Sequence, residues 1–144
     1  MACITLLSDF GVQDASVAIA KGVLMQYLPA SEIVDISHEV LPFQVRQAAY
    51  IFGTAYKNFP QGSIHLLLFD LFSDAIPKLI LSEHNGHYFL SPDNGILPLA
   101  LGNNPEHSWA CFESGKTNNF LDWLNAAGKT IKVIKLSLIH ISEP

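Results

Sequence analysis

The stretch "LLSDFGVQDASVAIAKG", residues 6–22, decides the fold class that the sequence predicts. It opens with an apolar run, changes at residues 8–11 (SDFG) to residue types typical of a turn, and resumes with apolar residues at helical spacing. A short buried strand followed by a helix is the repeating unit of an open α/β sheet. The join between them carries two carboxylates, Asp9 and Asp14, and the hydroxyl of Ser16, which a turn alone does not require.

The chain continues this alternation of strand and helix. The predicted elements are strand Ile4–Leu7, helix Ser16–Tyr27, strand Ile33–Ile36, helix Val45–Tyr56, strand Ser63–Phe69, and a hairpin with strands Leu79–Ser82 and Tyr88–Leu90 around Asn85-Gly86. A βαβαβ pattern followed by a hairpin predicts an α/β fold, with an open, Rossmann-like mixed sheet and helices on both faces.

Composition restricts the class of protein. The 144 residues are 49% hydrophobic and 15% charged, which is enough to bury one core, so we expect one globular domain. A net charge of −5 with only 8 Lys and Arg argues against a nucleic-acid partner. The sequence shows neither a signal-peptide pattern nor an apolar run long enough to span a membrane, so we expect a cytoplasmic protein without a membrane partner. Cys3 and Cys111 are far apart and predict reduced core thiols rather than a disulfide or a metal site.

The first join lies where an open α/β sheet binds its ligands, beyond the carboxyl ends of the strands. One interpretation is structural: Asp14 or Ser16 caps the following helix, and Asp9 and Gly11 shape a tight turn. A helix cap needs only one side-chain oxygen, so the structural interpretation gives no role to the second carboxylate. The other interpretation is that Asp9 accepts hydrogen bonds from two vicinal hydroxyls, as the ribose-binding acid of dinucleotide folds does.

Four segments, taken together, resemble a known family. They are "SDFG" (8–11), "VDISHEVLPF" (34–43), "QAAYIFGTAYKNFPQGSIH" (47–65) and "SPDNGIL" (91–97). In order and spacing they are similar to the S-adenosyl-L-methionine (SAM) hydroxide adenosyltransferases, the SAM hydrolases related to the SAM fluorinases and chlorinases. The resemblance covers roughly the first hundred residues. It implies a homotrimeric enzyme that attacks C5′ of SAM with water or halide and expels methionine, with SAM as the substrate and no cofactor.

The resemblance also implies roles for individual residues. Asp9 would grip the ribose hydroxyls, while Asp14 and Ser16 would hold the ammonium and carboxylate of the methionine part. Phe43 matches an aromatic position near the ribose, although its sequence context also allows an ordinary core aromatic. Asn94 matches a turn beside the site, although Asn-Gly turns are common in any protein.

The resemblance places the chemistry on Asp70, at the end of "HLLLFD" (65–70). In the hydrolases an Asp here, an Arg shortly after it and a His much later position the attacking water, whereas the halogenases have an aromatic residue at this place. A carboxylate repels a halide but accepts a proton from water, so Asp70 favours hydrolysis. The alternative is a plain polar residue at the end of a strand.

The sequence departs from the family pattern in four respects. The segment after Asp70 has no Arg and offers only the cation of Lys78, and residues 112–129 contain no matching His. The family's C-terminal β domain is expected to be absent, and residues 1–134 to form the N-terminal α/β domain. The segment 135–144 ("KLSLIHISEP") matches nothing in the family, and we expect it to be a tail of artefactual origin. The sequence therefore predicts a SAM hydrolase impaired in this chain, with a non-catalytic SAM- or nucleoside-binding module as the alternative and a SAM halogenase as the less favoured one.

Overall fold

The computed structural model describes residues 3–29, 32–71, 78–111 and 120–142. Its strands and helices, in chain order, are β1 (Ile4–Ser8), α1 (Ser16–Tyr27), β2 (Ile33–Ser37), α2 (Val45–Ala55), the 3₁₀ helix η1 (Tyr56–Asn58), β3 (Ile64–Leu68), β4 (Leu79–His84), β5 (His87–Pro92), α3 (Ile96–Leu101), β6 (His107–Ala110) and α4 (Phe120–Ser142).

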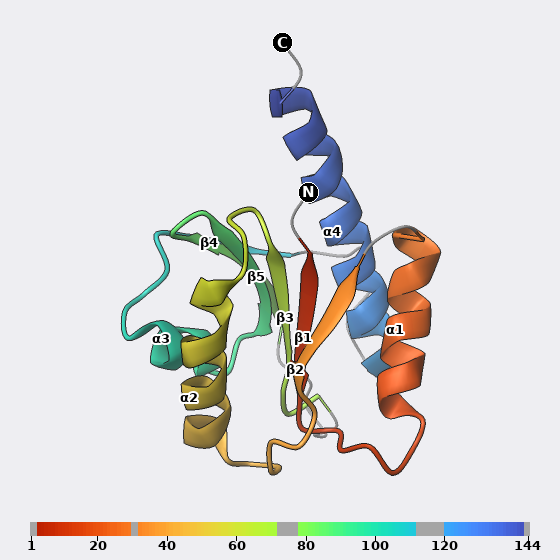
Figure 1. The fold of residues 1–144 in the computed structure, drawn as a ribbon, viewed down its shortest axis with the longest axis vertical. Helices are drawn as coiled ribbons and strands as arrows, with labels where there is room; N and C mark the ends of the chain where they lie inside the picture. The colour runs from red at the N-terminus through yellow and green to blue at the C-terminus, as the bar shows by residue number, and fades with distance from the viewer. Residues whose placement is uncertain (1–2, 30–31, 72–77, 112–119, 143–144) are drawn as a thin grey trace.

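The strands form one mixed sheet in the order β2-β1-β3-β5-β4-β6 (Figure 1). Strands β2, β1, β3 and β5 run parallel to one another, and β4 is antiparallel to both β5 and β6. Asn85 and Gly86 join β4 to β5 with φ angles of 52° and 79°, the left-handed conformation that tight two-residue hairpins require. The predicted α/β fold, its mixed sheet and its hairpin are therefore confirmed.

Helices cover both faces of the sheet, with α1 and α4 on one face and α2 and α3 on the other (Figure 1). The alternation of side chains along a strand divides the core accordingly. Leu66 of β3 packs in the cluster that holds residues of α1 and α4, and Leu67 packs in the cluster that holds residues of α2 and α3. Every residue of β1 and of β3 is buried, as expected of central strands covered on both sides. This rigid centre fixes the positions of the two loops that follow β1 and β3.

The structure differs from the predicted elements at the end of α2 and in the second half of the chain. Helix α2 ends at Ala55, and the next three residues continue as a 3₁₀ turn. Helix α4 runs through the predicted boundary at residue 134 without a break, and its last turns extend past the end of the sheet (Figure 1). Within the described ranges, the helices are all too short or too polar to cross a membrane.

Candidate functional site

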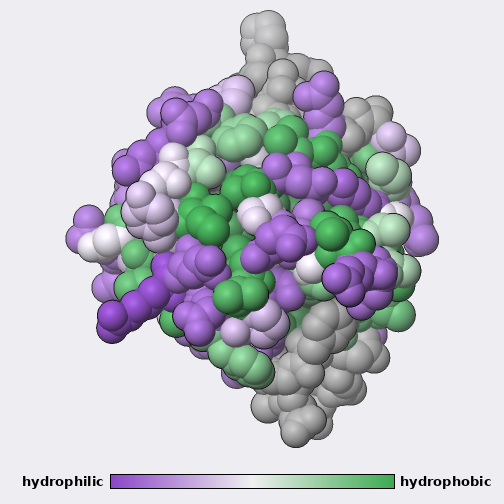
Figure 2. Space-filling view, turned by 60° about the horizontal axis from the view of Figure 1, so that its bottom comes forward, coloured by the Kyte–Doolittle hydropathy of each residue, from purple (hydrophilic) through white to green (hydrophobic). Residues whose placement is uncertain are grey.

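Two carboxylate-bearing residues meet at the carboxyl ends of the two central strands. Ser8 of β1 is in register with Leu68 of β3, so the residues that follow these strands leave the sheet side by side. The N–H of Asp70 donates a hydrogen bond to Oδ2 of Asp9, with 3.1 Å between the two atoms. Figure 2 shows this end of the molecule, where apolar surface lies among hydrophilic side chains. The structure thus brings together the two residues for which the family resemblance implies ribose binding and the chemical step.

In the described part of the chain, one carboxylate oxygen of Asp9 accepts a hydrogen bond and the other does not. Its Oδ1 atom is buried and has no hydrogen-bond partner in the described part of the chain. Burial raises the pKa of Asp9 above its ordinary value; the backbone N–H groups of Asp70 and of Asp9 itself act against this, and the nearby charge of Asp70 adds to it. An ionised carboxylate in this position is stabilised by any hydroxyl that donates to Oδ1.

Asp70 has an unusual backbone conformation. Its φ angle is 61°, in the left-handed region that non-glycine residues seldom adopt. Asp adopts this region more readily than most side chains, and residues held in sparsely populated backbone regions cluster at functional sites. Residues 72–77 and 112–119, where the family pattern places an Arg and part of the segment expected to supply a His, lie outside the described residues.

Asn94 joins the same strand end from a third loop. Its Nδ2 donates to the carbonyl oxygen of Phe69 at 3.4 Å, and its Oδ1 accepts the N–H of Ile96 at 3.2 Å where α3 begins. Gly95, with φ of 83°, allows the sharp turn between them. Asn94 therefore ties the β5–α3 turn to the residue that precedes Asp70, which agrees with the turn interpretation and with a place beside the site.

The remaining predicted residues lie on neighbouring loops at this edge. Oδ1 of Asp14 accepts the N–H of Ser16 at 2.9 Å, a bond that satisfies one of the first N–H groups of α1 and lowers the pKa of Asp14. The expectation that Asp14 or Ser16 caps the helix is wrong in its position, because Ala15 is the N-cap and no side-chain capping bond is made; Asp14 instead bonds the first helical N–H from the residue before the cap. Phe43 is 81% exposed and has a φ of 66°, so the alternative that it is a core aromatic is wrong.

The sequence did not predict a chain of hydrogen bonds that begins next to Asp9. Oγ of Ser8 lies 2.5 Å from Nδ1 of His38, and Nε2 of His38 lies 2.8 Å from Oδ1 of Asp35. Nζ of Lys21 donates to the other oxygen of Asp35 at 2.7 Å. The signal was present in the two polar motifs that end neighbouring strands, "SD" (8–9) and "DISH" (35–38), but it becomes visible only when β1 and β2 pair.

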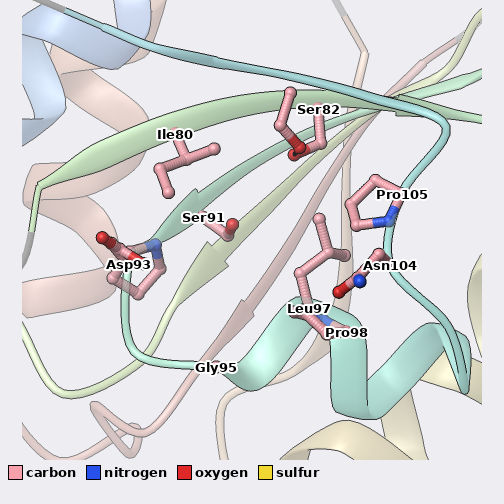
Figure 3. A pocket seen from close by; sticks show the side chains of 11 residues that line it. Ile80, Ser82, Ser91, Asp93, Gly95, Leu97, Pro98, Asn104 and Pro105 are labelled. Carbon is pink, nitrogen blue, oxygen red and sulfur yellow. Dashed lines mark hydrogen bonds between the residues drawn. The ribbon is translucent and has the colours of Figure 1, made fainter.

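A pocket of about 360 Å³ lies on the other side of the Asn94 turn, between α3 and the sheet (Figure 3). Asp93 and Gly95, the two neighbours of Asn94, line it, and the hydroxyls of Ser82 and Ser91 lie at the sheet side. Neither Asp9 nor Asp70 lines this pocket. It is therefore adjacent to the candidate site and does not include its carboxylates.

Comparison with known proteins identifies the family. A family model described as the SAM hydroxide adenosyltransferase N-terminal domain matches residues 4–127. The chain belongs to this family. The chain is 38% identical, over 98 residues, to an (R)-S-adenosyl-L-methionine hydrolase of Methanocaldococcus jannaschii, and the match covers 65% of the chain and 37% of the relative. It is also 34% identical, over 61 residues, to a fluorinase of an Actinoplanes species, which covers 42% of the chain and 20% of the relative.

Solved structures share the fold of the domain. A conserved hypothetical protein from Thermus thermophilus superposes with a TM-score of 0.75 at 28% identity, over 92% of this chain and 54% of that protein. An uncharacterized conserved protein from Thermotoga maritima gives a TM-score of 0.73 at 26% identity, over 88% of this chain and 54% of that one. The chain thus spans about half of each solved protein and 37% of the Methanocaldococcus hydrolase.

Proposed function

We propose that this chain binds SAM at the carboxyl edge of its parallel strands and takes part in its hydrolysis to adenosine and L-methionine. Support comes from the family, from the (R)-S-adenosyl-L-methionine hydrolases among its relatives, and from the pairing of Asp9 with Asp70. The chain shares the N-terminal part of those relatives, so the activity is proposed for the protein that contains this domain.

The observation that carries the proposal is the buried Oδ1 atom of Asp9, which has no partner in the described residues. A buried acceptor without a donor costs free energy, and native proteins tolerate few of them outside functional sites. Vicinal ribose hydroxyls are donors of the required kind. We infer that the ribose of SAM supplies the missing hydrogen bond.

Asp70 is the proposed catalytic residue. The sulfonium of SAM makes methionine a good neutral leaving group, so the protein needs mainly to exclude bulk water and to align one water with C5′. The oxygen of that water forms a bond to C5′, the C5′–S bond breaks with its electron pair passing to sulfur, and a proton leaves the water for a base. The carboxylate of Asp70 suits the role of base and disfavours a halide, which argues against halogenation despite the fluorinase relatives.

The finer assignments belong to the same proposal. Asp14 and Ser16 would bind the methionine end of SAM, Phe43 would line the nucleoside pocket, and Asn94 would hold the turn beside it. We also propose a cytoplasmic homotrimer, as the family resemblance implies. The high exposure of Phe43 supports its place in a pocket or at an interface, because burying an exposed aromatic ring against a ligand or a neighbouring chain is favourable in free energy.

Calorimetric titration of SAM and adenosine into the 144-residue chain tests the proposal, followed by chromatography for adenosine and methionine. We expect binding in the wild type and in Glu39→Gln, which removes an exposed acid, and loss of binding in Asp9→Ala. Product that forms in the wild type but not in Asp70→Asn would establish hydrolysis. Binding without product would leave the alternative of a binding module, a chloride-dependent 5′-chloro product would indicate a halogenase, and absence of binding would overturn the proposal.

A further inference from the structure

Four side chains form a continuous hydrogen-bonded line from the surface to the end of β1. Lys21 and Asp35 stand at the outer end, with side chains 30% and 40% exposed. His38 is 7% exposed, and Ser8 at the inner end is fully buried. The line crosses from α1 to β2 and then to β1, so it connects three elements that meet beside Asp9.

Ser8, His38 and Asp35 have the order of a hydrolytic triad, but the arrangement cannot act as one. A nucleophilic serine needs a face open to the substrate, and Ser8 has none. Its Oγ also accepts the N–H of Phe10 at 3.3 Å. The Ser8 side chain is thus enclosed by the loop that follows β1, and its hydrogen bonds hold that loop to His38.

The directions of the hydrogen bonds follow from Asp35. Partial burial acts to raise the pKa of Asp35, but the hydrogen bonds from Lys21 and His38 outweigh it and hold this pKa below its ordinary value. The ionised carboxylate accepts only, so Nε2 of His38 donates to it. In the neutral ring Nδ1 is then an acceptor, and the hydroxyl of Ser8 donates to it. The salt-bridged acid thereby fixes the ring that holds Ser8.

We propose that His38 is a positioning residue: through Ser8 it fastens the loop after β1 and so sets the direction in which Asp9 enters the site. Two further bonds support the role. The N–H of Gly11 donates to the backbone oxygen of His38 at 2.7 Å, and the N–H of Phe10 donates to Ser8. Asp9 lies between these fastened residues, so its carboxylate direction depends on them. The inference rests on the proposed role of Asp9 in binding ribose.

Two substitutions of His38 separate the hydrogen bond to Ser8 from the hydrogen bond to Asp35. The amide of Asn reaches the place of Nδ1 and can hold Ser8 but not Asp35, whereas the longer Gln reaches the place of Nε2 and can hold Asp35 but not Ser8. Ser8→Ala removes the inner bond from the other side. His84→Gln is the matched control, because His84 also accepts a hydrogen bond, from the N–H of Glu106, but lies in the β4–β5 hairpin.

The first readout needs no ligand. Hydrogen exchange of the Gly11 amide reports whether the loop stays fastened, and a carbon-13 titration of the Asp9 carboxyl reports whether the acid stays buried. We expect Gly11 to exchange about tenfold faster in His38→Gln and Ser8→Ala, with the Asp9 titration moving toward that of an exposed acid. In His38→Asn and His84→Gln both should stay close to wild type, with unchanged circular dichroism in all four variants.

The second readout is the dissociation constant for adenosine. We expect it to rise about tenfold in His38→Gln and Ser8→Ala and less than about threefold in His38→Asn and His84→Gln. If Gly11 exchange and the Asp9 titration are the same in all variants, the positioning role is overturned whatever the binding data show. If the loop responds as expected but the wild type binds no adenosine, the proposed function fails and the fastening of the loop stands.

Discussion

Asp9 is partly buried and its Oδ1 atom is fully enclosed, so its charge has opposite effects on the stability of the fold and on ligand binding. Its folded pKa lies above the ordinary value of 3.8. The associated stabilisation is therefore complete below the pKa of the unfolded chain and is lost as pH rises through the folded pKa. At neutral pH the ionised carboxylate costs stability. Asp9→Asn is expected to raise the melting temperature at pH 7 while weakening adenosine binding by at least about tenfold. A melting temperature that falls would contradict this account.

The same acid predicts a pH dependence of binding. Ribose hydroxyls donate to the ionised carboxylate, so nucleoside affinity should be constant above the folded pKa of Asp9. As pH falls through that pKa, the dissociation constant should rise, by up to about tenfold per pH unit. Calorimetry between about pH 4 and pH 7.5 measures this profile. Asp9→Asn supplies the control, because its residual affinity should show no such step; a step that persists in the variant would assign the titration to another group.

Phe43 combines a strained backbone with an exposed ring. Its left-handed φ of 66° costs an L-residue roughly 1–2 kcal/mol, which glycine avoids. The ring is 81% exposed, so its removal loses little burial. Phe43→Gly is expected to raise the free energy of unfolding by about 0.5–1 kcal/mol in urea denaturation. Phe43→Ala removes the ring but keeps the strain, so it should not stabilise; equal stability of the two variants would show that the strain is absent in solution.

At the scale of elements, the sequence predicted the first half of the chain well because its periodic segments are bounded by turn residues. Helix α1 begins and ends at the predicted residues, and β1 differs from its prediction by one residue. Helix α3 was not predicted because its six residues include Pro98 and give little periodic signal. Strand β6 was not predicted either, since its four residues are all exposed.

The residues of the candidate site also divide into those that the sequence could indicate and those that it could not. Asp9 could be singled out from sequence because it follows an apolar run that is typical of a strand, and Asp70 because the resemblance to the family marks its position. The link between Ser8, His38 and Asp35 could not, because 30 residues separate Ser8 from His38 and only strand pairing brings them together. The exposure of Phe43 was equally out of reach, since it depends on the backbone conformation of a single loop residue.

Where α1 packs against α4, Gly128 of α4 lies close to the ring of Tyr27 of α1. A Cβ atom at Gly128 would overlap the ring of Tyr27, whose hydroxyl donates to Asn125. Gly128→Ala is therefore expected to lower the free energy of unfolding by about 1–3 kcal/mol, through overpacking.

Gly22 in α1 is the matched control, because an added Cβ there meets nothing within 4 Å. Gly22→Ala should stabilise by about 0.4–1 kcal/mol, since alanine restricts the unfolded chain more than glycine does. Chemical denaturation of both variants measures the difference. If both substitutions stabilise, the two helices are not packed as closely as described.

At the scale of the whole molecule, the buried central strands differ in backbone conformation from the loops beyond the carboxyl ends of the sheet. Strands β1 and β3 are buried along their whole length, whereas the loops at their carboxyl ends contain the positive φ angles of Gly11 and Asp70, and the loop after β2 contains that of Phe43. A rigid sheet can hold such strained loops because the cost is spread over a large core. The candidate site therefore lies where the core ends, next to the strands that fix it most firmly.

The boundary of the folded unit is the last question at this scale. Among the side chains of α4 that the structure describes, which end at residue 136, Ile131 and Ile134 are the last in the core cluster, and Leu136 is 53% exposed. A chain that ends at Leu136 keeps these core residues, so its free energy of unfolding should fall by less than about 1 kcal/mol. Ile131→Ala in the full chain is the comparison and should cost about 2–5 kcal/mol, because it leaves a cavity. Urea denaturation measures both losses. A loss on truncation as large as that of Ile131→Ala would show that residues 137–144 belong to the folded domain, against the prediction that residues 135–144 form a tail.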